Sequence, residues 1–264
     1  MIIGKALIVP AIQLVKADKI LNNNTWEVIK EVSDRKQGQN FWAIGDCKQI
    51  TMNGKVSDGL TLTNYTAWVY IIGFNHNAEK EGNGIAFQGF KVADKGKDVC
   101  LVDSAYGDTH TSGIWLSMNN SETNTGGWEA CLMRKNVMPL IKASFPADLQ
   151  AVIKSSTIFT ASSNGNVALT ATQDEVFLLA EYEIFGTHHN ASTQEPNYLK
   201  QYSYYSAGNS KVMYKHEDIS TAAYWWERSL NASNTIGFCG VYTDGSAVGY
   251  RANFSSGVAP CFKV

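Results

Sequence analysis

The sequence lacks the features of several large protein classes. It has no excess of positive charge, because 22 basic residues stand against 24 acidic ones, whereas a general nucleic-acid binder carries a basic excess or stripe. It has no apolar run near the roughly 20 residues that cross a bilayer, so we expect no nucleic-acid partner and no membrane insertion. The N-terminus also lacks a basic start and a small-residue cleavage site, so we expect synthesis in the cytoplasm without a signal peptide.

Cysteine pairs and catalytic signatures are also missing. The cysteines are Cys47, Cys100, Cys131, Cys239 and Cys261. Their odd number, wide spacing and lack of a CxxC pair favour reduced, buried thiols over a disulfide framework. The signatures GxSxG, HExxH, the P-loop and GxGxxG are absent. We therefore predict a protein that is not an enzyme and uses no cofactor.

Three short stretches contain residue types that bind metals, and each has a simpler interpretation. Asp108–His110 offers two ligands without an apparent third, and the pair His188–His189 follows a predicted helix end, where such residues are usually solvated. Glu195-Pro196-Asn197 is the tripeptide with which many calcium-dependent lectins hold a sugar, but Pro196 also fits a first helical turn. His76 suits a turn better than a general base. We predict no metal site.

Hydrophobic periodicity predicts an α+β fold with one main domain. Between residues 25 and 90, short apolar runs separated by Asn and Gly clusters predict strands, with Asn53-Gly54 as a hairpin turn. Helical spacing predicts four later helices, over Gly126–Phe145, Ala147–Ser155, Asp174–Phe185 (closed by Gly186) and Glu195–Ala207. Small side chains from Thr235 to Ser256 predict a β-meander around a type I′ turn at Asp244-Gly245. Strands with a few helices are typical of the α+β class.

The most specific pattern lies near the C-terminus. Tyr224-Trp225-Trp226-Glu227-Arg228-Ser229 is followed by a Gly-rich meander and then by Gly257-Val258-Ala259-Pro260-Cys261-Phe262. This order resembles the C-type-lectin-like domain of phage and bacterial surface proteins, and more closely the variable proteins of diversity-generating retroelements. The resemblance covers nearly everything from Trp26 onward. It implies a C-type-lectin-like fold with an antiparallel sheet and flanking helices.

The resemblance further implies that residues 235–256 form a variable region. In that family a reverse transcriptase changes adenines, mainly in AAC codons, which does not produce Lys, Met, Trp, Gln or Glu. These five types make up 52 of the 264 residues, yet none occurs in positions 235–256, where composition predicts about four. A constant, Gly-rich hairpin is the alternative, because loops are often poor in these types.

A variable region divides the C-terminal residues into a scaffold and a display set. The inward-facing scaffold positions are Trp225, Trp226, Phe238, Val241, Ala247, Ala252, Val258, Pro260 and Phe262. The display positions, predicted to bind the ligand, are Ile236, Gly237, Gly240, Tyr242, Asp244, Ser246, Val248, Gly249, Tyr250, Arg251, Asn253, Phe254 and Ser256. Large aromatic side chains and Arg dominate interface hot spots while small polar ones adapt, as in antibody paratopes.

The implied function is ligand or receptor binding by a hypervariable display protein. We expect phage host recognition or adhesion, on a phage virion tail or a bacterial cell surface, with a protein or glycan receptor on the host cell as partner. We expect domain 25–264 to carry this region, and segment 1–24, which includes the apolar stretch Ile2–Val15, to serve attachment or trimer formation. The alternatives are a structural virion protein with an invariant face and an enzyme like those that make formylglycine. The enzymes need a close cysteine pair, whereas Cys239 and Cys261 lie far apart in the sequence.

Overall fold

A five-stranded antiparallel sheet organises the fold, and the C-terminal strand lies inside it. The computed structural model describes residues 15–165 and 167–264, with 21% helix and 34% strand, which places the protein in the predicted mixed class. The sheet order is β1-β2-β3-β13-β7. Its strands are β1 (Cys47–Ser57), β2 (Leu60–Phe74), β3 (Ile85–Lys91), β13 (Cys261–Lys263) and β7 (Val176–Phe177). Phe262 of β13 pairs with Phe87 on one side and Val176 on the other.

The central sheet is held by a buried aromatic cluster around this last strand. Phe262 stacks on Phe87, with ring centroids 5.5 Å apart, lies edge-on to Trp26 and packs at a tilt against Phe145. All four side chains are buried. Burial of such rings is the largest apolar contribution that single residues make to a core. Residues near both ends of the described chain therefore share one core, which we call the core aromatic cluster.

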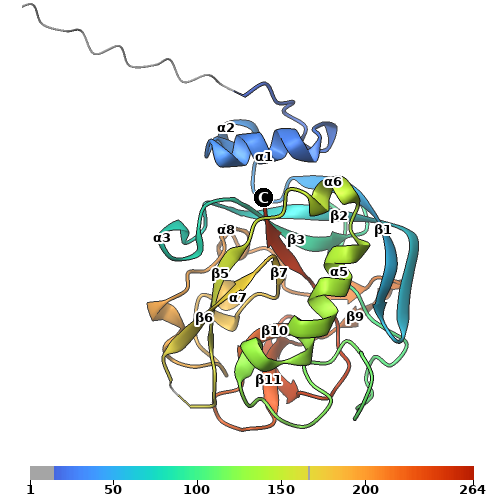
Figure 1. Cartoon of the computed structure of the whole chain (residues 1–264), viewed down its shortest axis with the longest axis vertical. Helices are drawn as coiled ribbons and strands as arrows, with labels where there is room; N and C mark the ends of the chain where they lie inside the picture. Colours follow the sequence, from blue (N-terminus) through green and yellow to red (C-terminus); the bar gives the residue numbers. More distant parts are fainter. Residues whose placement is uncertain (1–14, 166) are drawn as a thin grey trace, which may run out of the picture.

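The segment after Thr25 is helical, which corrects the prediction of strands there. Helix α1 (Trp26–Asp34) starts at Thr25, whose side chain accepts a hydrogen bond from the Val28 N–H, and it is followed by α2 (Gly38–Phe41). Its buried residues are Trp26, Ile29, Val32 and Ser33, a helical spacing that short sequence windows hide. Figure 1 shows α1 at one end of the molecule and β10 and β11 at the other.

The first hairpin turns later than predicted. Asn53 and Gly54 lie inside β1, and the turn between β1 and β2 is Asp58-Gly59. Gly54 has φ +128° at a register irregularity, so its positive φ serves a bulge rather than a turn. The Asn53 side chain accepts a hydrogen bond from the Asn64 N–H. The Asn-Gly pair therefore correctly indicated a residue with positive φ. That residue lies in a bulge of β1 and not in the hairpin turn.

The four predicted helices are shorter than the sequence suggested. The observed elements are α4 (Gly127–Ala130), the π-helix η2 (Met133–Val137), α5 (Met138–Ser144), α6 (Ala147–Gln150), α7 (Glu181–Phe185), the 3₁₀ turn η3 (Glu195–Asn197) and α8 (Ser203–Ser206). Cys131 is extended and separates α4 from η2. Gly186 ends α7 in the left-handed conformation, as predicted. Tertiary pairing overrides helical periodicity at the start of the predicted third helix, where β6 ends at Asp174 and β7 covers Val176–Phe177.

Three smaller sheets surround the central one. Their strands are β10 (Trp225–Leu230), β11 (Gly237–Val241) and β12 (Ala247–Arg251) in one sheet, β4 (Val99–Cys100), β8 (Met213–Lys215) and β9 (Asp218–Ala223) in another, and the pair β5 (Ser156–Ala161) and β6 (Leu169–Asp174). The predicted meander is thus present. Its loop is not a type I′ turn, since Gly245 has φ +87° and Asp244 is not left-handed. The short elements η1 (Leu21–Asn23) and α3 (Ala78–Glu81) complete the fold.

The described part of the N-terminal segment packs on the main domain. Val15 and Leu21 are buried, and the indole N–H of Trp42 donates to the Asp18 carbonyl at 3.0 Å. Most of Ile2–Val15 lies outside the described residues, so its role in attachment or trimer formation stays a prediction. No helix within 15–165 or 167–264 is long and apolar enough to cross a membrane. All five cysteines are free and buried, as expected.

Candidate functional site

Four half-buried aromatic rings form a continuous stack at the surface, which we call the aromatic platform. It consists of Tyr106, Tyr224, Tyr250 and Phe254. Tyr224 lies 4.7 Å from both Tyr106 and Tyr250, and Tyr250 stacks on Phe254 at 5.5 Å with an interplanar angle of 9°. Stacked rings at these distances stabilise one another while leaving part of each face to solvent. The platform is our candidate functional site.

The platform is built from separate parts of the chain that backbone hydrogen bonds hold together. Tyr106 lies in the loop after β4, and its hydroxyl oxygen accepts a hydrogen bond from the Tyr224 N–H at 3.0 Å. The loop around Tyr106 is bonded to the segment after β12, through Gly107 N–H to Ser255 carbonyl and Ser255 N–H to Asp108 carbonyl. Rings on rigidly held backbone lose little entropy on binding.

A buried carboxylate anchors this junction from beneath. Asp103 accepts hydrogen bonds from the Ser255 hydroxyl at 2.7 Å, the Leu116 N–H at 2.8 Å and the Ser57 hydroxyl at 3.1 Å. It is 3% exposed, so these bonds replace its lost hydration. The loop that carries Tyr106 is thereby joined to both the hairpin β1–β2 and the segment after β12.

Charged and polar groups surround the platform. Lys215 Nζ lies 4.4 Å from the centroid of the Tyr106 ring, a cation–π geometry. Arg251 pairs with Glu122 at 2.7 Å, and both side chains are exposed. Burial, with a contribution from neighbouring tyrosines, raises the pKa of Tyr224 and Tyr250. The platform therefore presents neutral hydroxyls and ring faces beside both signs of charge.

Most predicted display positions lie at the surface of the sheet β10–β12 and its loops. The exposed or half-buried ones are Ile236, Tyr242, Asp244, Ser246, Val248, Gly249, Tyr250, Arg251 and Phe254. Tyr250 and Phe254 belong to the platform. The structure thus brings the bulky display residues to the candidate site.

Four predicted display positions are buried, which corrects their assignment. These are Gly237, Gly240, Asn253 and Ser256. A Cβ at Gly237 would lie 2.5 Å from the Tyr250 carbonyl oxygen, and one at Gly240 would lie 2.7 Å from the Trp225 carbonyl oxygen. The Ser256 hydroxyl donates to the Tyr224 carbonyl at 3.0 Å. At Gly237 and Gly240 the neighbouring backbone lies too close for any side chain. These positions therefore serve packing and not ligand contact.

The Trp-Trp-x-Arg-Ser motif faces inward and supports the site without forming it. The indole N–H groups of Trp225 and Trp226 donate to the carbonyls of Lys211 and Leu116, each at 3.0 Å. Arg228 binds both carboxylate oxygens of Glu183, at 2.6 and 2.7 Å, and is fully buried. All predicted scaffold residues are buried except Ala247, which is half-buried.

Sequence reasoning missed two of the four platform rings. Tyr224 stood at the start of the quoted motif without a role, and Tyr106 lies between a serine, an alanine and a glycine in a loop. An aromatic residue in a turn-rich loop is exposed unless something packs on it, and this is the signal that could have found Tyr106. Its proximity to Tyr224 depends on long-range pairing that no local pattern shows.

The possible calcium tripeptide serves a structural role. Glu195 is 3% exposed, and its carboxylate accepts hydrogen bonds from the Ser229 hydroxyl and from the Tyr182 N–H at 2.9 Å. Burial raises the pKa of Glu195 to about 7. Glu195-Pro196-Asn197 forms the 3₁₀ turn η3, with Pro196 near its start as predicted, but the predicted helix does not continue from it to Ala207.

Two groups of buried residues among the described ones place metal-binding atoms within 4.8 Å of one another. The first is His76, Glu81 and Glu183. Its carboxylates already pair with cations, Glu81 with Lys263 at 3.0 Å and Glu183 with Arg228, so they need no ion. The second group is Glu181, Glu227 and Cys239. Asp108–His110 and His188–His189 belong to neither group.

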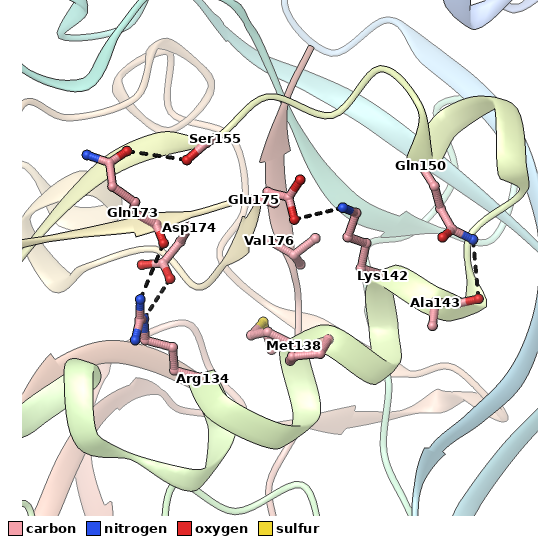
Figure 2. A pocket seen from close by; sticks show the side chains of 11 residues that line it. Arg134, Met138, Lys142, Ala143, Gln150, Ser155, Gln173, Asp174, Glu175 and Val176 are labelled. Carbon is pink, nitrogen blue, oxygen red and sulfur yellow. Dashed lines mark hydrogen bonds and ion pairs between the residues drawn. The ribbon is translucent and has the colours of Figure 1, made fainter.

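A hollow of about 460 Å³ lies between α5 and the strands β6 and β7. Figure 2 shows Arg134 facing Asp174 and Lys142 facing Glu175, as ion pairs of 2.6 and 2.7 Å. Because each cation is paired with a carboxylate, the hollow offers no free charge that would hold a charged substrate. We therefore rank it below the platform.

Fold and site together define an α+β protein with an exposed aromatic face. Residues 98–264 match a family described as a domain of unknown function, DUF6273, and the match covers more than half of the chain. The chain therefore belongs to the DUF6273 family. The matched region includes all four platform residues but not β1 to β3. No curated protein and no solved structure matches the chain.

Proposed function

We propose that this chain is a receptor-binding protein whose aromatic platform contacts a protein or glycan on the surface of a host cell. The proposal includes a C-type-lectin-like fold and a role as the variable protein of a diversity-generating retroelement, on a phage virion tail or a bacterial cell surface. The observation that carries it is the platform itself, because stacked, half-exposed rings with adjacent charges are typical of binding surfaces.

Ring faces suit both receptor chemistries. Aromatic side chains supply large, rigid contact area at low entropy cost, as in antibody paratopes. Tyr106, Tyr224 and Tyr250 add hydroxyl groups that can exchange hydrogen bonds with sugar hydroxyls or peptide groups. Exposed Arg251 adds a donor group of the type that is enriched at interface hot spots.

Variation at the surface positions is compatible with a fixed backbone. The Asn124 side-chain amide donates to the carbonyls of Asn234 and Gly237, each at 2.9 Å. The Ala252 N–H donates to the Ile236 carbonyl, and the Asn119 N–H donates to the Ala252 carbonyl. These bonds hold both ends of the hairpin β11–β12 through main-chain groups, which do not depend on the identity of the surface side chains.

The alternative of an invariant structural face makes a different prediction about DNA. A retroelement leaves a near-copy of the 3′ end of the gene, differing at template adenines, next to a reverse transcriptase gene. We expect sequencing downstream of this gene to find that copy, with its differences confined to the codons of the surface display positions. A gene without such a copy would contradict the variable-protein role and favour a constant face.

A binding assay tests the platform directly. We would immobilise the full chain and measure capture of candidate host cells and of an array of bacterial glycans, for the wild type and for Tyr250→Ala. We expect Tyr250→Ala to weaken capture by about tenfold or more, as for a hot-spot aromatic. Ile219→Ala is the matched control, since Ile219 is exposed on β9 and outside the platform. Equal losses in both variants would contradict the proposal.

A further inference from the structure

A carboxylate without any hydrogen-bond partner lies inside the molecule and belongs to none of the buried ion pairs described above. Glu227 of β10 is 0% exposed, and neither of its carboxylate oxygens has a hydrogen-bond partner. The neighbouring Arg228 binds Glu183 instead, on the opposite face of the strand, because successive side chains alternate. A buried carboxylate without a cation, a donor or a proton is very unfavourable, so Glu227 requires a partner.

Two more potential ligands converge on Glu227. Glu181 at the start of α7 and Cys239 of β11 place their donor atoms within 4.8 Å of each other and of a Glu227 oxygen. Both are fully buried. The three residues come from different elements, β10, α7 and β11, so their convergence is a product of the tertiary fold rather than of local sequence.

The Glu181 carboxylate is held in position by backbone donors. One of its oxygens accepts hydrogen bonds from the backbone N–H groups of His189, Asn190 and Ala191, at 2.7 to 2.9 Å. The other oxygen accepts a hydrogen bond from the Asn190 N–H at 2.9 Å, and a carboxylate oxygen with one such bond keeps a lone pair for a further partner. Glu181, Glu227 and Cys239 therefore form a fully buried cluster of two carboxylates and one thiol.

We propose that Glu181, Glu227 and Cys239 bind a zinc ion. Zinc is bound by carboxylate oxygen at about 2.0–2.2 Å and by thiolate sulfur at about 2.3 Å, and the three donor atoms here lie within 4.8 Å of one another. The thiol distinguishes zinc from calcium and magnesium, which take oxygen ligands. Three protein donors leave the fourth tetrahedral position for a small ligand such as water. The sequence predicted no metal site, because these residues are far apart along the chain.

The ion would connect the hairpin to the body of the protein. Cys239 pairs with Gly249 of β12, so its strand forms the base of the surface that carries the display positions. Zinc at this point fixes β11 to α7 and to β10. The inference rests on the buried cluster alone and does not depend on receptor binding.

Cobalt titration of the full chain, purified without metal, tests the proposal. Co²⁺ substitutes for zinc and gives a thiolate charge-transfer band in the near ultraviolet when cysteine is a ligand. We expect one equivalent to produce this band, and one equivalent of zinc to remove it. At a hundredfold excess over Kd, zinc should raise the Tm by about 5–10 °C.

Two variants and a matched control locate the site. Glu227→Gln and Cys239→Ser should each weaken Co²⁺ binding by about 100-fold or more, whereas Cys131→Ser, which changes a buried cysteine outside the cluster, should bind like the wild type. If a variant fails to fold, the wild-type titration still decides.

Two results would overturn the assignment. Wild-type protein that binds Co²⁺ without the thiolate band would place the metal at exposed histidines such as His188 and His189. Wild-type protein that binds no metal, with Glu227→Gln at least as stable as the wild type, would show that Glu227 is protonated and donates to Glu181.

Discussion

The molecule contains two aromatic clusters of similar size in opposite settings. The core aromatic cluster, around Phe262, is fully enclosed between the central sheet and its helices, whereas the aromatic platform leaves its rings half-exposed. Ring distances are similar in both, at 5.4 to 6.1 Å and 4.7 to 5.5 Å. The two clusters differ in how far other residues bury their rings. Aromatic side chains therefore stabilise the fold in the core aromatic cluster and remain available for binding in the aromatic platform.

Large changes in the buried part of the C-terminal motif should have the greatest effect on stability. Trp226→Ala removes a fully buried indole and should lower the free energy of unfolding by about 3–5 kcal/mol. Urea denaturation followed by circular dichroism measures this loss. A loss below about 1 kcal/mol would mean that the motif does not belong to the scaffold.

Removing one partner of the buried ion pair should be nearly as severe. Arg228→Met leaves the Glu183 carboxylate buried without its cation and should cost about 3–5 kcal/mol. The double variant Arg228→Met, Glu183→Gln should recover about 1–3 kcal/mol relative to the single one, because the orphaned charge is gone. Additive losses in urea melts would show that the pair is not coupled.

Acid should weaken the fold through a half-buried histidine. His216 Nδ1 accepts a hydrogen bond from the Val102 N–H at 3.2 Å, and burial lowers the pKa of His216 to about 4. The unfolded chain takes up this proton near pH 6.5 and the folded chain only near pH 4, so stability falls as the pH drops through this window.

A variant isolates this effect from other titrating groups. Between pH 7 and pH 5, the wild type should lose about 2 kcal/mol more than His216→Asn, whose amide oxygen can still accept the Val102 hydrogen bond. Urea melts of both proteins at the two pH values give the difference. Equal losses would mean that His216 takes up its proton in the folded protein as readily as in the unfolded chain.

Changes at the exposed rim should leave stability almost unaltered. Tyr242→Ser and Arg251→Gly should each change the free energy of unfolding by less than about 1 kcal/mol, because both side chains are exposed. Their effect should appear in receptor capture instead. A loss of several kcal/mol in either variant would place these residues in the scaffold and remove the contrast between the two clusters.

Sequence reasoning was most successful where local pattern and tertiary environment agree. The meander β10–β12, the burial of Trp225 and Trp226 and the left-handed cap at Gly186 follow from residue type and spacing. It failed where long-range contacts decide. It also failed where the window was too short, because Thr25 caps a helix that a four-residue window presents as a strand.

The candidate site was predictable in part for the same reason. Tyr250 and Phe254 were assigned to the surface by the resemblance of residues 235–256 to a variable region, but the same argument misplaced Gly237 and Gly240. Their lack of a side chain allows close backbone packing. In a single sequence, a glycine required for packing cannot be distinguished from a glycine at a variable position. Tyr106 and the cluster around Glu227 depend on contacts between distant segments, which local patterns do not contain.

A block exchange of surface residues tests the separation of scaffold and binding surface most directly. We would replace the exposed and half-buried display residues between 236 and 254 with those of a sibling protein that captures a different host. We then measure cell capture and the urea midpoint of both proteins. We predict that host specificity follows the exchanged residues while the urea midpoint stays nearly constant. Unchanged specificity, or a large fall in the midpoint, would contradict this account.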